Sequence, residues 1–103
     1  LYIPFPDSKL EQRIIESRVP ELESSLRSQL VAFVQSLRGL DLKKVPAVSE
    51  TIDWARTLVL LHAEELDTAL VRSTLNILLK FQDDIETVDA EIPGLARQAA
   101  KSA

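Results

Sequence analysis

Few side chains in this sequence could carry out chemistry, and their spacing does not assemble them into a catalytic set. The single histidine, His62, has neither a cysteine nor a second histidine with which to share a metal ion. Asp83, Asp84 and Glu86 form an acidic cluster, but neighbouring acids on a helix diverge, so we expect a solvated face. The sequence therefore predicts no metal site, and no nucleophile–base pair or glycine-rich phosphate loop is visible.

Two other polar features could meet a ligand. Ser49 precedes an apolar segment, where its hydroxyl could cap a helix by accepting a backbone N–H. The free N–H groups of such a helix end also suit an anion. Lys43 and Lys44 lie just before it. They are most simply solvated loop residues, and contact with a nucleotide or a partner is the alternative.

The apolar segment itself, residues 46–62, is predicted to be the helix around which the fold is organised. After its first turn it is apolar on almost every side, and a helix of that kind is normally surrounded by other elements. Trp54 is therefore expected in the core. His62 is expected in the last turn of this helix, where a positive charge is favourable.

Three further helices are predicted around that central one. The first covers about residues 9–18, with Ser8 and Glu11 spaced as a capping box, and Pro20 stops it. Asp67 is expected to cap the last of the four, which runs to about Lys80.

The remaining predicted helix begins at Pro20, where the missing N–H costs nothing. It ends at Gly39, in position for a left-handed cap. Its apolar residues follow a period of 3.6, and its opposite, polar face carries Glu23, Arg27, Gln35 and Arg38.

Together these segments predict an all-α fold, a small bundle of four main helices. Residues 1–7 contain Pro4 and Pro6, which rule out a helix, and they are expected to be an extended linker. Residues 8–88 would form the helical domain. Beyond Asp89 the apolar pattern decays, so residues 89–103 are expected to be a weakly ordered tail.

Composition narrows the class of protein further. The formal net charge of −4 argues against nucleic-acid binding, which needs a basic surface. No apolar run reaches the roughly 18–20 residues that span a bilayer. The absence of cysteine fits a cytoplasmic protein. Because the chain has no methionine and begins with Leu1, we expect it to be one domain of a longer protein.

Two stretches resemble the lid domain of MoxR-type AAA+ ATPases. Residues 1–7 (LYIPFPD) and the helix that carries Glu11, Arg13, Ile14 and Ile15 resemble the join between base and lid. Residues 48–58 (VSETIDWARTL) and a helix pair ending at residues 78–86 (LLKFQDDIE) are similar to the rest of that lid. The resemblance covers about residues 1–87.

This resemblance implies a role within a larger protein. In the family, a base domain absent from this chain holds ATP and magnesium, and the lid closes over the adenine and ribose. Neighbouring subunits form a ring, usually a hexamer, and hydrolysis drives chaperone-like assembly or maturation of protein complexes, often beside a von Willebrand factor A partner. The chain alone is then expected neither to hydrolyse ATP nor to hold a cofactor, although its parent would be an ATPase.

The family's sensor-2 motif often reads Gly-Ala-Ser-x-Arg, and residues 47–51 stand in its place. Thr51 occupies the arginine position, so the positive fork that arginine offers a terminal phosphate is missing. Arg56 lies five positions further on, about 140° around the helix, and is a poor substitute. The resemblance makes Ser49, Thr51 and Ile14 the nucleotide-proximal residues, with helix cap and core as the simpler alternative for each.

A hypothesis from another class also fits the pattern. The chain could be a free-standing helical interaction or dimerisation module, which binds a partner helix through an apolar groove.

Overall fold

Five helices follow one another along the part of the chain that the computed structural model describes, residues 6–100. They are α1 (Ser8–Arg18), α2 (Ser24–Leu37), α3 (Val48–Leu60), α4 (Thr68–Leu78) and α5 (Gln82–Ala100). No strand occurs between residues 6 and 100, so the all-α prediction is confirmed. Of the expected linker, residues 1–5 lie outside the described residues, as do residues 101–103 of the expected tail.

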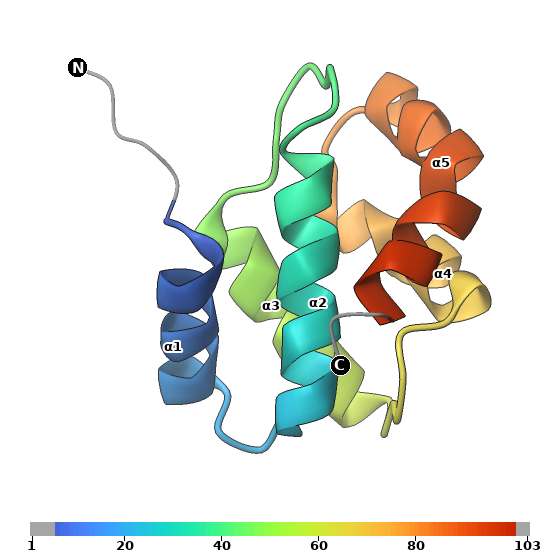
Figure 1. Ribbon diagram of the computed structural model, residues 1–103. Helices are drawn as coiled ribbons and strands as arrows, with labels where there is room; N and C mark the ends of the chain where they lie inside the picture. The colour runs from blue at the N-terminus through green and yellow to red at the C-terminus, as the bar shows by residue number, and fades with distance from the viewer. Residues whose placement is uncertain (1–5, 101–103) are drawn as a thin grey trace.

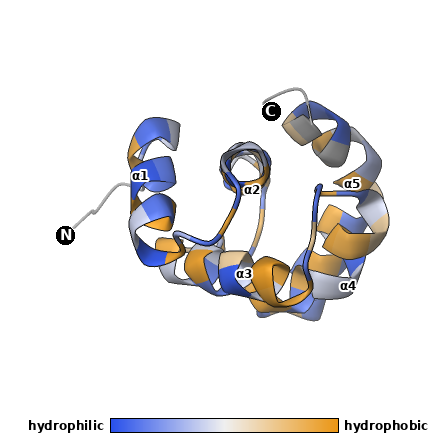
Figure 2. Ribbon diagram, turned by 90° about the horizontal axis from the view of Figure 1, so that it is seen from below, coloured by the Kyte–Doolittle hydropathy of each residue, from blue (hydrophilic) through white to orange (hydrophobic). Residues whose placement is uncertain are grey.

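The helix at the centre of the bundle is α2. Figure 2 looks along α2 and shows it between α1 and α5, with α3 and α4 forming a second layer on one side. This position agrees with the wide buried face of α2, which contacts α1, α3 and α5. Its buried residues are Leu26, Gln29, Leu30, Val31, Phe33, Val34 and Leu37.

The prediction that residues 46–62 form the central helix is therefore wrong. Within the second layer α3 buries only one face, which carries Thr51, Trp54, Ala55 and Leu58. Its last apolar residues are exposed, because no other described element covers that side of the helix. An apolar pattern around a helix shows that it can be buried, but the neighbouring helices decide which helix is surrounded.

Trp54 lies in the core, as predicted, and its polar group has a partner there. The side chain has no exposed surface, and its ring centroid lies 5.4 Å from that of Phe33 on α2. Its indole N–H donates a 2.8 Å hydrogen bond to the Thr74 hydroxyl on α4. Trp54 thus joins the two layers of the bundle without leaving a buried donor unsatisfied.

The starts of α1 and α4 use the aspartate that precedes each helix. Asp67 accepts a 2.8 Å hydrogen bond from the Leu70 N–H, which confirms it as the cap of α4. At α1 the cap is Asp7, which accepts from the Leu10 N–H at 2.8 Å, and the prediction of Ser8 is wrong. Aspartate caps as well as serine and adds a negative charge to the positive end of the helix dipole.

Two other predicted helix ends also differ from the structure. The cap residue of α2 is Glu23 rather than a residue before Pro20, because the backbone turns between residues 20 and 22. Gly39 does not adopt a positive φ, so it is no left-handed cap. The end of α2 is closed instead by tight hydrogen bonds, from the Gly39 N–H to the Ser36 carbonyl and from the Leu40 N–H to the Leu37 carbonyl.

The left-handed cap occurs at the end of α3, at His62. This residue has φ of 55° and lies just beyond the helix. The prediction that it lies in the last turn is therefore wrong. The N–H of His62 bonds the Val59 carbonyl and the N–H of Ala63 bonds the Leu58 carbonyl, which is the Schellman arrangement. A histidine therefore occupies a backbone conformation that usually falls to glycine.

The prediction of a weakly ordered tail over residues 89–103 is wrong for residues 89–100, because residues 89–100 form the second half of α5. Val88, Ile92, Leu95 and Ala99 recur at helical spacing and are buried, where α5 packs against α2 and α4 (Figure 1). Pro93 interrupts the hydrogen bonding of the helix, at a cost of about 3 kcal/mol. Burial of each large apolar side chain contributes about 1.5–3 kcal/mol, which offsets that cost.

The packing of α5 leads to a stability prediction. Ile92→Ala should lower the free energy of unfolding by about 2–5 kcal/mol, since it leaves a cavity beside α2 and α4. The matched control is Glu91→Ala, one position earlier and exposed, which should change stability by less than about 0.5 kcal/mol. Urea denaturation followed by circular dichroism measures both. Equal stability of the two variants would show that this half of α5 does not contribute to the core.

Candidate functional site

The start of α3, where the resemblance puts the nucleotide-proximal residues, is held by a buried ion pair. Arg38 at the end of α2 donates two hydrogen bonds to the Glu11 carboxylate on α1, at 2.7 and 2.8 Å. Only 8% of the Arg38 side chain and none of the Glu11 side chain is exposed. The two bonds form a bidentate pair, the strongest geometry that these groups can adopt.

The same two side chains tie three parts of the chain together. The Arg38 Nε–H donates to the Pro46 carbonyl at 2.9 Å, just before α3. Gln35 donates to Glu11 at 2.7 Å and to the Pro6 carbonyl at 3.2 Å, just before α1. The approach to α1 and the approach to α3 are thus fixed to each other through the end of α2. We call Glu11, Gln35 and Arg38 the polar cluster.

Sequence reasoning missed the polar cluster. It put Gln35 and Arg38 on the solvated face of a helix and made Glu11 part of a capping box, and both predictions are wrong. Helical periodicity identifies faces within one helix, whereas the partners here are 24 and 27 residues apart in sequence. The one available signal was that these polar residues lie close to the apolar stripes of their helices.

Ser49 and Thr51 lie in the first turn of α3, but their environments differ. Thr51 is fully buried, and its hydroxyl donates to the Ala47 carbonyl at 3.2 Å and lies 3.5 Å from an Arg38 nitrogen. Ser49 is exposed and does not cap the helix, because the cap residue is Ala47, which offers no side-chain hydrogen bond. Of the two, only the Ser49 side chain is open to solvent.

Ile14, the third residue in this set, is half-buried on α1. Helix α1 packs against α3, so Ile14 comes from a helix that neighbours the one carrying Ser49 and Thr51 (Figure 1). Arg56 does not lie in the first turn of α3. It lies in the second half of α3 and lines a hollow with Arg18 and Leu60, which agrees with its rejection as a substitute for the missing arginine.

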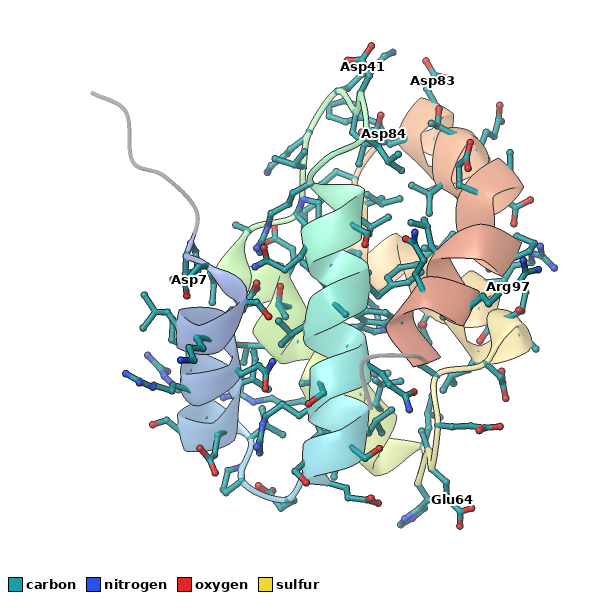
Figure 3. All side chains as sticks on the ribbon, viewed as in Figure 1. Asp7, Asp41, Glu64, Asp83, Asp84 and Arg97 are labelled. Carbon is teal, nitrogen blue, oxygen red and sulfur yellow. The ribbon has the colours of Figure 1, made fainter. Side chains whose placement is uncertain are left out.

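The loop between α2 and α3 is held in place by α5 as well as by the polar cluster. Asp84 is 2% exposed and accepts hydrogen bonds from the backbone N–H groups of Lys43, at 2.8 Å, and Lys44, at 3.1 Å. Figure 3 shows Asp83 and Asp84 at the same end of the molecule as Asp41 in this loop. The prediction of a wholly solvated acidic face is wrong for Asp84, because the loop folds over it.

The lysines of this loop are exposed, as predicted. The ammonium group of Lys43 lies 2.6 Å from Asp83, and both side chains are more than half exposed. A pair of this kind contributes about 0–1 kcal/mol. The fixed position of the loop therefore depends on the buried Asp84 rather than on the surface ion pair.

The described part of the chain was searched for two further features, a group of metal-ligating side chains and a membrane-spanning helix. Between residues 6 and 100, no three His, Asp or Glu side chains gather closely enough to hold a metal ion. In the same part of the chain, no helix has the length and apolar content to cross a bilayer. Comparison of the sequence and the structure with family models, curated proteins and solved structures gives no match.

Removal of one partner from the buried Glu11–Arg38 pair should be strongly destabilising. Glu11→Gln leaves the Arg38 charge buried without its carboxylate and should lower the free energy of unfolding by about 3–5 kcal/mol. The matched control is Arg72→Met, which breaks the exposed Arg72–Asp89 pair and should cost less than about 1 kcal/mol. Urea denaturation measures both. Equal losses would mean that the buried pair is no more important than a surface one.

Glu50 offers a pH-dependent test of the first turn of α3. The Ser49 hydroxyl donates a 2.7 Å hydrogen bond to Glu50, and this bond is the main reason why the pKa of Glu50 is lowered. Lys80 and Lys44 lower this pKa further, and partial burial opposes them. Because the pKa is lower in the folded state, this contribution to stability is present at neutral pH and lost as the pH falls through the lowered pKa.

Ser49→Ala should therefore raise the pKa of Glu50 towards its ordinary value, as measured by an NMR pH titration of the side-chain carboxyl. Its stability deficit at neutral pH should disappear in acid. Ser73→Ala is the control, because Ser73 is an exposed serine that bonds its own helix at the Leu70 carbonyl. An unchanged Glu50 pKa in Ser49→Ala would show that the hydroxyl is not the cause of the shift.

Proposed function

We propose that this chain is the lid domain of a MoxR-type AAA+ ATPase. It would close over ATP and magnesium held by a base domain and couple hydrolysis to chaperone-like assembly or maturation of protein complexes. The order of the motifs, from the Pro-Phe-Pro entry to residues 48–58 and then residues 78–86, is what suggests the family. The all-helical bundle is consistent with this role.

One structural observation supports the proposal most directly. Through Gln35 and Arg38, the polar cluster binds both Pro6, where the chain enters the bundle, and Pro46, which leads into α3. A base domain attached before residue 1 would therefore enter beside the first turn of α3. Nucleotide bound at the edge of that domain would lie close to Ser49, and any rotation of the lid would move α1, α2 and α3 as one body.

Because Thr51 stands where the family's motif has an arginine, we propose that this lid moves with the nucleotide state and does not bind the terminal phosphate. Thr51 is buried and hydrogen-bonded, so no charge is offered to a terminal phosphate from that position. In this proposal the phosphates and magnesium are held by the base domain and the neighbouring subunits of a cytoplasmic ring, usually a hexamer. The lid then transmits the nucleotide state as an angle to client complexes and takes no direct part in the chemistry. A von Willebrand factor A protein is its partner in this proposal.

The full-length protein provides the test. The gene should encode a phosphate loop roughly two hundred residues before Leu1, and the purified protein should hydrolyse ATP. Ser49→Trp, which puts a large ring on the exposed first turn of α3, should lower the rate at least about tenfold if that turn borders the nucleotide, since misplacement of about 1 Å costs about a hundredfold. Gln98→Trp, at an exposed position of α5, is the control and should leave the rate unchanged.

Two results would contradict the proposal. One is a different domain type, without a phosphate loop, encoded upstream of Leu1. The other is micromolar binding of ATP by residues 1–103 alone in calorimetry, because a lid without its base domain has no group that holds the phosphates.

The second candidate function is a helical interaction module. The observation that favours it is a pair of exposed leucines at the end of α3, where Leu60 is 78% exposed and Leu61 is 53% exposed.

A further inference from the structure

Helix α1 lies at the edge of the bundle and turns one side away from it. Among the described helices it packs against α2 and α3 only, and Figure 2 shows it at the periphery. Its buried residues, Glu11 and Ile15, form the inner side. At about 100° per residue, two rows one helical turn long lie away from that side. We call these rows the outer face, and they are Lys9 with Arg13 and Leu10 with Ile14.

The apolar row of the outer face is not used by the fold. Leu10 is 48% exposed, and Ile14 is half-buried. Neither side chain belongs to the hydrophobic core or packs against it. Single exposed apolar residues are common, but two of them spaced by four positions follow the pattern by which one helix contacts another.

The basic row is not used by the fold either. Between residues 6 and 100, the structure records no ion pair for Lys9 or Arg13, both of which are exposed. The acidic side chains of α1 and its cap differ, because each interacts with another group of the same molecule. They are Asp7, Glu11 and Glu16. The helix thus keeps its negative charges for internal contacts and presents its positive charges to solvent.

This arrangement of charge opposes the stability of α1 itself. Lys9 lies in the first turn of the helix, where the dipole makes a positive charge unfavourable. Lys9 and Arg13 are four positions apart, and like charges at that spacing also destabilise a helix. Residues that work against local stability without an internal partner are expected at functional surfaces. The basic row therefore indicates a negatively charged partner.

From these observations we infer that the outer face binds a helix of another protein in which apolar side chains are flanked by aspartate or glutamate. The apolar side chains of that helix would cover Leu10 and Ile14. Its carboxylates would lie beside Lys9 and Arg13, and the guanidinium of Arg13 can bind a carboxylate through two hydrogen bonds. Such a partner matches both rows at once.

Other anionic partners match only the basic row. A phosphate backbone offers nothing to the apolar row, and the net charge of −4 repels polyanions as a whole. An anionic membrane is repelled in the same way, and interfacial helices bury a far larger apolar face than two side chains. An acidic amphipathic helix is therefore the occupant that the outer face fits best.

This inference rests on neither candidate function, since it uses only the charges and exposure of α1. The contact is small compared with about 800 Å² per partner in stable complexes. We therefore expect a dissociation constant on the order of 100 µM. Because exposed charges contribute, binding should weaken in high salt.

The first experiment titrates the chain with a designed peptide and follows its amide resonances by NMR. The peptide consists of about 20 residues in repeats of Glu-Leu-Ala-Glu-Leu-Leu-Glu, long enough to form a helix. We expect saturable shifts centred on residues 8–18. A peptide with lysine in place of every glutamate, or alanine in place of every leucine, should not bind. Absence of binding up to about 1 mM peptide, or shifts centred on another helix, overturns the inference.

Two substitutions test the rows separately. Leu10→Asn should weaken binding at least about tenfold. Its control is Phe81→Asn, because Phe81 has a similar exposure of 46% but lies just before α5, and its affinity should stay unchanged. Arg13→Glu should weaken binding by a similar factor, whereas Arg97→Glu, at an exposed arginine of α5, should not. Equal effects of a variant and its control overturn the inference.

Lys9→Glu separates a binding role from a structural one. It should weaken binding of the acidic peptide at least about fivefold. It should also raise the urea midpoint of unfolding, because a glutamate at this position suits the helix dipole and pairs with Arg13. A variant that loses stability would show that Lys9 serves the fold, and this result overturns the inference. Ile14, which the lid proposal places near nucleotide, is left unchanged, so either proposal can fail alone.

Two further measurements exclude the other occupants. Sedimentation of the chain with vesicles of phosphatidylserine and phosphatidylcholine should show no binding at physiological salt. Sedimentation equilibrium of the chain alone should show no association that Arg13→Glu weakens. Vesicle binding that Arg13→Glu abolishes would assign the outer face to a membrane, and self-association with the same sensitivity would assign it to a second copy. Either result overturns the inference.

Discussion

The buried contact between Arg38 and Glu11 is the constraint on which the arrangement of the first three helices depends. Two charges removed from water cost several kcal/mol each, and their mutual attraction repays this only in good geometry. The bidentate bonds at 2.7 and 2.8 Å provide that geometry. Such a pair contributes little net stability compared with apolar residues of the same volume, but it tolerates only one relative position of α1 and α2. Its effect is to select an arrangement rather than to strengthen the core.

The same principle recurs at two further places, in the connection between α2 and α3 and in that between α3 and α4. Asp84 on α5 fixes the loop between α2 and α3 through the backbone N–H groups of Lys43 and Lys44. Gln29 on α2 accepts a 3.0 Å hydrogen bond from the Leu66 N–H, in the connection between α3 and α4. In each case one buried polar side chain from a helix satisfies a backbone group of a connection that would otherwise be left without a partner. Aliphatic packing holds the helices together, and these side chains hold the connections.

This division explains how much of the fold could be predicted from the sequence. Helical segments near residues 9–18 and 67–80 and the burial of Trp54 follow from local patterns, because periodicity and capping residues are read within a few turns. The anchoring roles of Glu11 and Asp84 could not be read in this way, since the partners of Asp84 lie 40 and 41 residues away. Such side chains look solvated until the connection that covers them is placed. The second half of α5 was missed because its apolar pattern is sparse, although Val88, Ile92, Leu95 and Ala99 keep a helical spacing and are buried.

The two ends of α3 have different physical characters, and each end corresponds to one of the two candidate functions, the lid domain and the interaction module. At its start, the Pro46 carbonyl is fixed by Arg38, and Thr51 is buried against the same cluster, so this end cannot move independently of α1 and α2. At its other end, exposed leucines are followed by His62, whose left-handed backbone conformation costs roughly 1–2 kcal/mol in a residue other than glycine. A fixed end can transmit motion from an attached domain, whereas an apolar, uncovered end is suited to contact with another molecule. The start of α3 thus fits the lid proposal, and its exposed leucines fit the alternative of an interaction module.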